Sequence, residues 1–416
     1  MKLTIHTMFY GGAGSGLDER GTLHSVPFVL PGEQVEISLT HAGPELIAID
    51  QPSPHRVNPR CPHFGPCGGC QYQHVAYPEQ TAIKRQILQD TFAHEGLTTP
   101  APGLHTAEPW QYRNRIRLRV ASVDGELRLG YNRRGSYEML PIDECPIAAP
   151  LLIEAAQALI ASAEPLPGWA DNLDEIELFA NHDQSKLQIT LFLRSDRKID
   201  LALLCTQLQQ RIPQLAGAGI VVTGTSGRKH QPGATWGTPG LLYHVAGRDY
   251  WVSRPSFFQV NRLLVDTLVK LAADGRSGDL AWDLYAGVGL FSRVLAERFA
   301  RVTAVETVAA DLTQSLRSPH RAVGSTVLDF LRAAILERDR PDLILADPPR
   351  AGLGPEVCAL LARIRAPQIV YVSCDPVTLA RDLRALVDSG YTVNTVDLVD
   401  LFPQTFHMET VVTLHR

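Results

Sequence analysis

The C-terminal part of the sequence alternates short apolar runs with stretches of helical character, and this pattern constrains the fold most. From about residue 279 onward the apolar runs are rich in Val, Ile and Leu. The expected strands are Asp279–Tyr285, Val302–Glu306, Leu343–Ala346, Ile369–Ser373, Val393–Val399 and Thr410–Leu414. Strands that alternate with helices favour a doubly wound, Rossmann-like sheet. The sequence therefore predicts an α/β domain over residues 255–416.

The chain is too long for one hydrophobic core. With 416 residues it is expected to form two or three domains. Residues 1–55 contain β-like runs broken by glycine, which is typical of a small β-barrel. Residues 56–254 combine a helix expected at 78–96 with strands and turns, so we expect a central α+β domain. A further helix expected at 255–274 leads into the C-terminal domain.

Cys374 lies between the apolar run Ile369–Ser373 and a helix that Asp375 and Pro376 are expected to begin. Asp is a favoured N-cap residue, and Pro is favoured at the first helical position. A thiol at a helix N-terminus lies near the positive end of the helix dipole, which favours the reactive thiolate. The alternative is an inert buried cysteine, because free Cys is among the most buried residue types.

The other strand ends favour a functional role for Cys374. Tyr285 precedes the loop Gly287–Gly289, whose glycines allow the backbone to approach a ligand closely. Glu306 ends the next strand, at the position where an acid binds ribose hydroxyls in such folds. Asp347 follows a third strand and precedes two prolines, which suits a shaped pocket better than a helix cap. Ser292 stands where nicotinamide enzymes carry a third glycine, and this favours S-adenosylmethionine over NAD.

A cysteine-rich segment indicates a metal centre. Cys61, Cys67 and Cys70 are spaced by five and then two residues, with two glycines between the last pair. Zinc and iron-sulfur clusters both need a fourth ligand, and Cys145, which is followed by Pro, is the candidate. The lack of a second Cys-x-x-Cys disfavours a zinc ribbon. His63 could also be a ligand, but a structural role is the preferred interpretation.

The composition indicates where the protein acts and which partners it binds, rather than which reaction it catalyses. Apolar residues make up 45% of the chain and the net charge is -5. The N-terminus has no apolar signal region, and no run approaches the ~20 apolar residues of a membrane span, so we expect a cytoplasmic protein. The negative charge disfavours nucleic acid, but a local basic stripe on one strand face could reverse this expectation. Its members are Arg113, Arg115, Arg117 and Arg119. Cys205 and Cys358 are expected to be buried in packing.

Together these segments resemble the RNA uracil-carbon-5 methyltransferase family, in its iron-sulfur branch, over nearly the whole chain. The resemblance rests on the ordered motifs at 61–70, 257–261, 282–292, 347–350, 373–376 and 400–409. It implies an N-terminal TRAM domain, which is an OB-like RNA-binding module. It also implies a [4Fe-4S] cluster on Cys61, Cys67, Cys70 and Cys145, and S-adenosylmethionine bound by Gln259, Tyr285, Glu306 and Asp347.

The resemblance also implies the catalytic pair, with Cys374 as the nucleophile and Glu409 as the base. A Cys added to carbon 6 of uracil makes carbon 5 nucleophilic, and a carboxylate then removes the carbon-5 proton after methyl transfer. The Arg113 to Arg119 stripe becomes an expected RNA surface. One segment departs from the family pattern, since residues 307–330 are short, which leaves the adenine contacts open.

The expected activity is S-adenosylmethionine-dependent methylation of carbon 5 of a uridine in RNA by a monomeric enzyme. Large-subunit (23S) ribosomal RNA is the favoured target, because the barrel and cluster together resemble the large-subunit enzymes. A uridine in tRNA is the alternative. Two other classes are a non-catalytic iron-sulfur RNA-binding protein and a radical or redox enzyme. The radical-type spacing Cys-x3-Cys-x2-Cys is absent from the sequence, and the cluster is expected to be structural.

Overall fold

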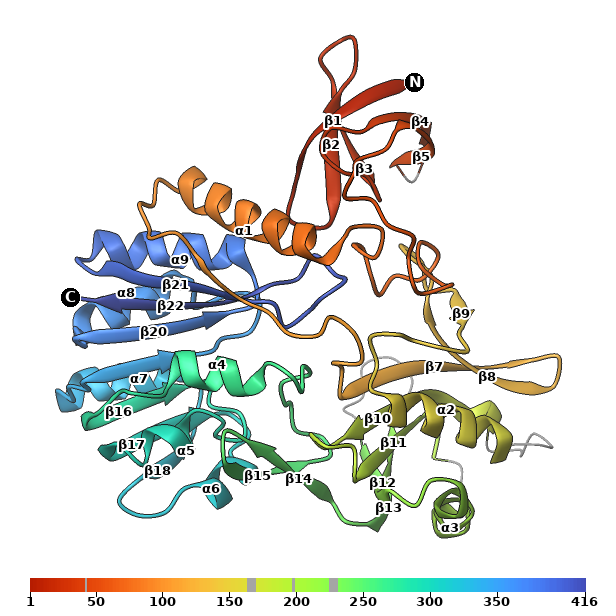
Figure 1. Cartoon of the computed structure of the whole chain (residues 1–416). Coiled ribbons are helices and arrows are strands. Elements are labelled where there is room, and N and C mark those ends of the chain that lie inside the picture. Colours follow the sequence, from red (N-terminus) through yellow and green to blue (C-terminus); the bar gives the residue numbers. More distant parts are fainter. Residues whose placement is uncertain (42, 163–169, 197–198, 224–230) are drawn as a thin grey trace. The chain divides into compact units, whose positions relative to one another are not determined.

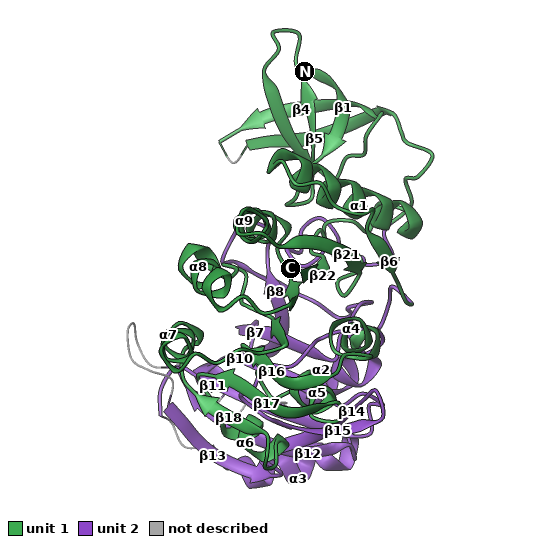
Figure 2. Ribbon diagram, turned by 90° about the vertical axis from the view of Figure 1, so that its left-hand side faces the viewer, with its two compact units in different colours: residues 1–58, 71–107, 264–416 green, residues 59–70, 108–263 purple. Residues whose placement is uncertain are grey.

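The computed structural model describes residues 1–416 except 42, 163–169, 197–198 and 224–230 (Figure 1). The chain forms two compact units (Figure 2). The first unit comprises Met1–Asn58, Gln71–Ala107 and Leu264–Arg416, and the second comprises Pro59–Cys70 and Glu108–Leu263. The expected three-domain division stays a prediction. The structure adds that residues 71–107, which we assigned to the central region, pack within the first unit.

The main sheet of the first unit is doubly wound, as predicted. Its strands are β16 (Gly278–Leu284), β17 (Phe299–Glu306), β18 (Arg321–Gly324), β19 (Leu343–Ala346), β20 (Gln368–Ser373), β21 (Thr392–Val399), β22 (Glu409–His415) and β6 (Gly103–His105). The order is β18-β17-β16-β19-β20-β22-β21-β6. Strands β18 to β20 run parallel, whereas β22 is antiparallel to both its neighbours. The short strand β6, which we did not predict, adds to β21 in parallel.

Helices cover this sheet. They are α1 (Tyr77–His94), α4 (Val265–Ala272), α5 (Ser292–Leu295), α6 (Ala310–Ser315), α7 (Val327–Glu337), α8 (Gly354–Ile364) and α9 (Pro376–Asp388). Helix α8 contacts α7 and α9, and α1 contacts α9, while α4 contacts β20, β21 and β22 (Figure 1). Every residue of β19 is buried, as expected for a parallel strand covered on both faces. The core includes the fully buried rings of Trp282 and Tyr371.

The N-terminal strands of the first unit form a small antiparallel sheet. They are β1 (Lys2–Met8), β2 (Ala13–Leu17), β3 (Leu23–Pro27), β4 (Gln34–Thr40) and β5 (Gly43–Gln51), in the order β3-β2-β1-β4-β5. The outermost strands β3 and β5 contact each other, so the sheet curls around its own core. That core contains Ile5, Val26, Val35 and Ile37.

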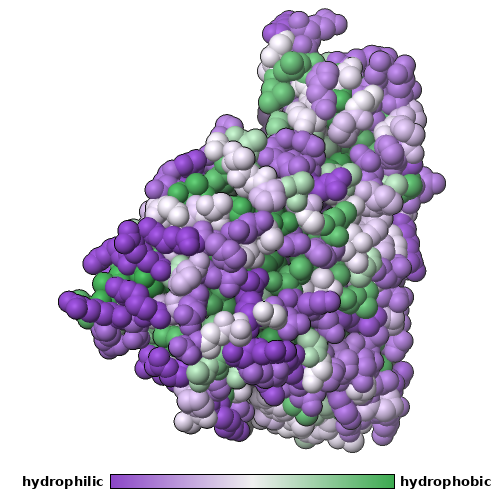
Figure 3. Space-filling view, turned by 60° about the vertical axis from the view of Figure 1, so that its left-hand side comes forward, coloured by the Kyte–Doolittle hydropathy of each residue, from purple (hydrophilic) through white to green (hydrophobic). Residues whose placement is uncertain are grey.

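The second unit is built on a mixed sheet in the order β13-β12-β11-β10-β7-β8-β9. Its strands are β7 (Arg115–Val123), β8 (Glu126–Asn132), β9 (Met139–Pro141), β10 (Leu173–Ala180), β11 (Leu187–Leu193), β12 (Leu215–Val222) and β13 (Gln231–Gly237). The other elements are α2 (Pro150–Ser162), η1 (Ala170–Asn172), α3 (Leu201–Arg211) and the hairpin β14 (Gly240–Val245) with β15 (Arg248–Ser253). The face shown in Figure 3 is mainly hydrophilic, with hydrophobic residues in separate areas.

One predicted helix is shorter than expected. The helix expected at 78–96 is confirmed as α1, but that expected at 255–274 is helical only over Val265–Ala272. Residues before it pair with another segment of backbone instead. The amide of Asn114 donates to the carbonyl of Val260 at 2.9 Å, and that of Arg262 donates to Tyr112 at 3.0 Å. These non-local hydrogen bonds override the local helical pattern.

Candidate active site

Four of the predicted site residues lie at the carboxyl ends of parallel strands. Tyr285 follows β16, Glu306 ends β17, Asp347 follows β19 and Cys374 follows β20. Strand order reverses at β16, because β17 and β18 lie on one side of it and β19 and β20 on the other. Ligands of open α/β sheets bind at such a switch point. The four side chains therefore belong to one edge of the sheet.

Glu409 reaches the same edge from an antiparallel strand. Thr410 of β22 pairs with Ser373 of β20. Cys374 directly follows Ser373 and Glu409 directly precedes Thr410, so this register brings the two predicted catalytic residues to neighbouring positions. The Glu409 side chain is buried, whereas Cys374 is only partly buried.

The glycine loop after β16 is tied to the acid that ends β17. The amide of Gly287 donates to Glu306 Oε2 at 3.0 Å, and the amide of Thr307 donates to Glu306 Oε1 at 2.7 Å. Gly289 has φ +87°, and a Cβ there would lie 3.0 Å from a methyl group of Leu312. Glycine is therefore required at this turn, and the turn aligns the Glu306 carboxylate beside the loop.

Three carboxylates meet at this edge: Asp283 and Glu409 are buried, and Asp347 is partly buried. Asp283 accepts a hydrogen bond from the Ser292 hydroxyl, and burial raises the pKa of Asp283 to about 7. Burial and the charge of Asp283 raise the pKa of Asp347. Burial and the charge of Asp347 raise the pKa of Glu409 well above its ordinary value, against the charge of Arg350. Carboxylates with raised pKa values in a buried site are typical of proton-transferring centres.

The environment of Cys374 contradicts one expectation. Asp375 is the N-cap of α9, as predicted, and accepts from the amides of Val377 and Thr378 at 3.1 and 3.0 Å. The thiolate is nevertheless not favoured. Burial and the charge of Glu409 raise the pKa of Cys374 to about 11. Desolvation and nearby carboxylates outweigh the helix dipole, because both disfavour a second negative charge.

Arg350, to which the sequence analysis gave no role, supplies the opposing charge. It lowers the pKa of both Cys374 and Glu409. Its guanidinium lies 3.3 Å from Nδ1 of His407, and its carbonyl accepts from the Thr378 hydroxyl at 3.0 Å. The signal available in the sequence was its place three residues after Asp347, at the end of the same rigid loop.

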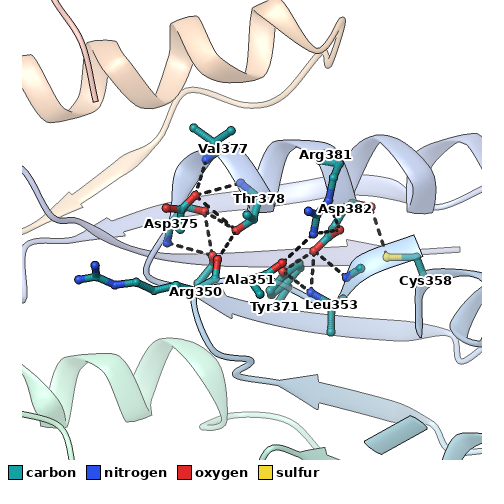
Figure 4. Close-up of polar contacts among 12 residues, drawn as sticks. Arg350, Ala351, Leu353, Cys358, Tyr371, Asp375, Val377, Thr378, Arg381 and Asp382 are labelled. Atoms are coloured by element: carbon teal, nitrogen blue, oxygen red, sulfur yellow. Dashed lines mark hydrogen bonds and ion pairs between the residues drawn. The ribbon is translucent and has the colours of Figure 1, made fainter. Parts of the chain in front are cut away.

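Asp382 of α9 fixes the loop that carries Arg350 (Figure 4). Its Oδ2 accepts from the Leu353 amide at 2.7 Å and from the Tyr371 hydroxyl at 2.8 Å. Its Oδ1 accepts from Arg381 at 2.8 Å, and Arg381 also donates to the carbonyl of Ala351 at 2.9 Å. The helix that begins after Cys374 therefore also holds the loop after Asp347.

The four predicted cluster cysteines all lie in the second unit. The Cys67 amide donates to the His63 carbonyl at 2.9 Å, which closes a tight turn between the thiols. The Tyr131 hydroxyl lies 4.0 Å from Cys145 Sγ. Cys61, Cys67, Cys70 and Cys145 are each partly buried, and none of them forms a disulfide.

These thiols are near enough to interact electrostatically. Burial, together with the charges of Cys145 and Cys67, raises the pKa of Cys61 to about 11. The charges of Cys67 and Cys145 thus act on Cys61 although the thiols come from two separate segments, and soft thiolate ligands suit iron-sulfur clusters or zinc. In the described part of the chain, however, no three His, Cys, Asp or Glu residues are close enough together to hold a metal ion as the side chains stand.

Gln259 also belongs to the second unit and is buried. Its carbonyl accepts from the side chain of Asn114 at 3.0 Å, which fixes the backbone of its motif. Its contact with the methyl donor stays a prediction.

Three of the four arginines of the predicted stripe alternate along β7, and their charges are paired within the protein, whereas Arg113 precedes the strand. Arg115, Arg117 and Arg119 of β7 form ion pairs with Glu177, Glu175 and Asp174 at 3.9, 2.5 and 3.5 Å. Arg115 and Arg117 also stack on the rings of Phe179 and Phe192. Acidic residues of β10 therefore neutralise the surface that we expected to bind RNA.

Two remaining expectations concern packing and membranes. Cys205 and Cys358 are buried, as predicted. Over the ranges that the structure describes, no helix combines the length and the apolar character needed to cross a bilayer.

The fold is that of an S-adenosylmethionine-dependent methyltransferase. The crystal structure of the Pyrococcus abyssi tRNA (uracil-54, C5)-methyltransferase in complex with S-adenosyl-L-homocysteine matches with a TM-score of 0.76 and 22% identity, and the match covers 100% of both chains. This likeness confirms the predicted α/β methyltransferase fold.

Sequence comparisons identify the family. A family model described as tRNA (Uracil-5-)-methyltransferase matches residues 324–416. The 23S rRNA (uracil(1939)-C(5))-methyltransferase RlmD of Halomonas elongata is 32% identical over 100% of this chain and 89% of that protein. An uncharacterized RNA methyltransferase of Rhizobium meliloti is 34% identical over 100% of this chain and 99% of that protein. The chain belongs to the RNA uracil-5-methyltransferase family and is an S-adenosylmethionine-dependent RNA methyltransferase.

Proposed function

We propose that this enzyme methylates carbon 5 of a uridine in 23S ribosomal RNA through a covalent bond between Cys374 and the uracil. The observation that carries the proposal is the pairing of Ser373 with Thr410, which brings Cys374 and Glu409 to neighbouring positions where the parallel strands end. A lone nucleophile would suit many reactions. A nucleophile beside a buried carboxylate suits addition followed by proton removal.

The residues divide the reaction between them. S-adenosylmethionine, when bound, supplies an activated methyl group, and Tyr285, Glu306, Asp347 and Gln259 are the residues proposed to hold it. Cys374 Sγ adds to carbon 6 of the uracil, and the electron pair of the double bond makes carbon 5 nucleophilic. After the methyl group has moved to carbon 5, Glu409 accepts the carbon-5 proton. The bond between carbon 6 and sulfur then breaks, which restores the double bond and releases Cys374.

The raised pKa values fit this sequence of steps. The Cys374 proton must leave before addition, and the positive charge of Arg350 favours the ionised forms of both Cys374 and Glu409. A carboxylate with a raised pKa is also a stronger base once it is ionised. The target uridine must leave its base stack to reach a partly buried thiol, so flipping of the base is expected.

Two variants test the chemistry. Cys374→Ala should abolish methyl transfer and the covalent adduct with 5-fluorouridine RNA, while binding of S-adenosyl-L-homocysteine survives. Cys205→Ala, in the second unit, is the matched control and should retain both activities. Glu409→Gln should let the methylated covalent adduct accumulate on uridine RNA. An adduct formed by Cys374→Ala would overturn the proposal.

The target is supported by full-length relatives named for 23S rRNA, whereas the family model and the matching crystal structure are named for tRNA. A uridine in tRNA is therefore the second candidate. Methylation of unmodified 23S rRNA and tRNA transcripts by the same preparation decides between them. Transfer of methyl groups to tRNA alone would reject the ribosomal target.

We further propose that Cys61, Cys67, Cys70 and Cys145 hold a structural [4Fe-4S] cluster, and that the N-terminal sheet is a TRAM-like, OB-like module that binds RNA. The electrostatic effect of Cys67 and Cys145 on Cys61 supports the first part, and the curled antiparallel sheet supports the second. Iron and acid-labile sulfide in anaerobically purified protein, lost in Cys70→Ser, would test the cluster against zinc. Methylation that requires a reductant would favour a redox role. A monomeric, cytoplasmic enzyme remains a prediction from the sequence.

A further inference from the structure

The loop that leads to Glu409 is held from outside the catalytic sheet. Residues 400–408 connect β21 to β22, and Glu409 is the first residue of β22. Helix α1, more than 300 residues earlier in the chain, lies beside this C-terminal region in the first unit (Figure 1). Three of its polar side chains, Tyr77, Gln80 and Lys84, bind the loop.

Lys84 of α1 forms a fully buried ion pair with Asp400. Lys84 Nζ lies 2.6 Å from Asp400 Oδ1, and both side chains are 0% exposed. The same ammonium donates to the carbonyl of Phe402 at 3.0 Å, and the Tyr77 hydroxyl donates to Asp400 Oδ2 at 2.9 Å. Burying two charges costs several kcal/mol per ion, so the pair adds little net stability, but removal of one partner would leave an uncompensated buried charge.

Gln80, one helical turn before Lys84, binds the other end of the loop. Gln80 Nε2 donates to Gln404 Oε1 and the Gln404 amide donates to Gln80 Oε1, both at 2.9 Å. The Gln404 carbonyl accepts from the amide of Tyr72 at 2.9 Å. Gln404 has φ +69°, a left-handed conformation that costs a non-glycine residue about 1–3 kcal/mol and persists only when its surroundings impose it.

We propose that Lys84 and Gln80 are positioning residues for the base: they hold the loop from Asp400 to Gln404 so that Glu409 enters β22 beside Cys374. The inference rests on the proposed function of Glu409. Neither residue is required for Cys374 to add to uracil, so the two steps of the reaction should respond differently when the anchor is removed.

The experiment separates addition from proton removal. Lys84→Met keeps the length of the side chain but leaves Asp400 without its cation. The adduct with 5-fluorouridine RNA requires addition by Cys374 but no proton removal, because fluorine replaces the carbon-5 proton. The variant should therefore form this adduct at nearly the wild-type rate. Turnover on uridine RNA should fall about tenfold or more, since a misplaced catalytic group can cost about 100-fold. The methylated covalent intermediate should then accumulate.

Three further variants distinguish a positioning role of the anchor from a general effect on stability. Lys270→Met, at an exposed position of α4, is the control and should match the wild type. Lys84→Met/Asp400→Asn removes the unpaired charge and should recover thermal stability without recovering turnover. If Lys84→Met does not fold, Tyr77→Phe tests the positioning role instead, because it deletes only one hydroxyl. Loss of that hydrogen bond should lower turnover by about twofold to tenfold without slowing adduct formation.

The outcomes distinguish the two levels of proposal. A wild-type enzyme that forms no adduct with 5-fluorouridine RNA would overturn the proposed function itself. A normal wild-type adduct, combined with variants in which adduct formation and turnover fall together or turnover does not change, would overturn only the positioning role.

Discussion

The hydroxyl of Tyr10 donates a hydrogen bond of 3.3 Å to the carbonyl of Cys374, a residue 364 positions later. The Tyr10 ring also packs edge-on against the Phe406 ring, with 5.3 Å between the ring centroids. The centroids of the Phe406 and His407 rings are 4.0 Å apart. Tyr10 belongs to the turn between β1 and β2 of the N-terminal sheet. One side chain of that sheet therefore contacts both the loop of the nucleophile and the loop that leads to Glu409.

We predict that Tyr10→Phe slows addition by Cys374 while it preserves the packing against Phe406. Loss of one hydrogen bond corresponds to about 0.5–1.5 kcal/mol, so adduct formation with 5-fluorouridine RNA should slow by about twofold to tenfold. The KM for RNA should change less than kcat, because the ring and its surface are kept. Tyr137→Phe, at a side chain that is 91% exposed, is the control. Equal effects of the two substitutions would contradict a link between Tyr10 and Cys374.

The raised pKa of Cys374 predicts an unusual alkylation profile. With a pKa of about 11, the thiol is protonated at neutral pH, and its thiolate fraction still rises above pH 9, where an ordinary cysteine levels off. The rate of iodoacetamide modification of Cys374, followed by peptide mass spectrometry, should therefore keep increasing between pH 7 and about 10. A plateau near pH 8 would show that the helix dipole dominates after all.

The contribution of the Glu409 carboxylate to the raised pKa of Cys374 can be measured in the same alkylation assay. Glu409→Gln removes a charge that raises the pKa of Cys374, so alkylation at alkaline pH should become faster even though turnover is lost. Glu356→Gln, at an exposed position of α8, should leave the alkylation rate unchanged. A slower or unchanged rate in Glu409→Gln would mean that the two side chains are not electrostatically coupled.

The sequence predicted where the site residues lie along the chain, but not how the folded protein shifts their pKa values. The carboxyl ends of strands and the N-cap at Asp375 depend on local patterns. The N-cap was predicted correctly and the carboxyl ends of the six expected strands to within one residue, whereas β6 and β18 were not expected. The predicted direction of the Cys374 pKa was wrong because that pKa depends on burial and on the charges of Glu409 and Asp347, which come from other strands. Tyr10 could not be predicted for the same reason, since nothing near position 10 indicates a partner at position 374.

The arginine stripe illustrates a different limit. Its period correctly placed Arg115, Arg117 and Arg119 on one face of β7, but a single strand does not reveal its neighbour. The acids that neutralise the stripe lie on β10, more than fifty residues later, and become visible only through the pairing of the two strands. Another non-local pairing, between Tyr112–Asn114 and Val260–Arg262, explains why the helix begins only at Val265.

Asp382 should be among the residues on which stability depends most. It is 1% exposed and accepts hydrogen bonds from an amide, a hydroxyl and a guanidinium. Hydrogen bonds to a buried charge contribute about 1.5–3 kcal/mol, so Asp382→Asn should lower the free energy of unfolding by at least that amount in urea denaturation. Asp388→Asn, in an exposed pair with Arg384, should leave the free energy of unfolding nearly unchanged, because solvent screens exposed ion pairs. Similar losses for both variants would argue against Asp382 as the anchor of the loop.

The ion pairs of β7 predict how RNA binding responds to salt. When a substitution removes one cation that neutralises a phosphate of single-stranded RNA, the slope of log K against log salt falls by about 0.7. Because Arg117 is paired with Glu175 at 2.5 Å, Arg117→Gln should leave both the RNA affinity and this slope unchanged. Glu175→Gln should instead free the guanidinium and strengthen binding at low salt, where unscreened charges act furthest. A reduced slope for Arg117→Gln would show that RNA displaces Glu175 from its partner. The stripe would then be a masked RNA surface rather than a structural network.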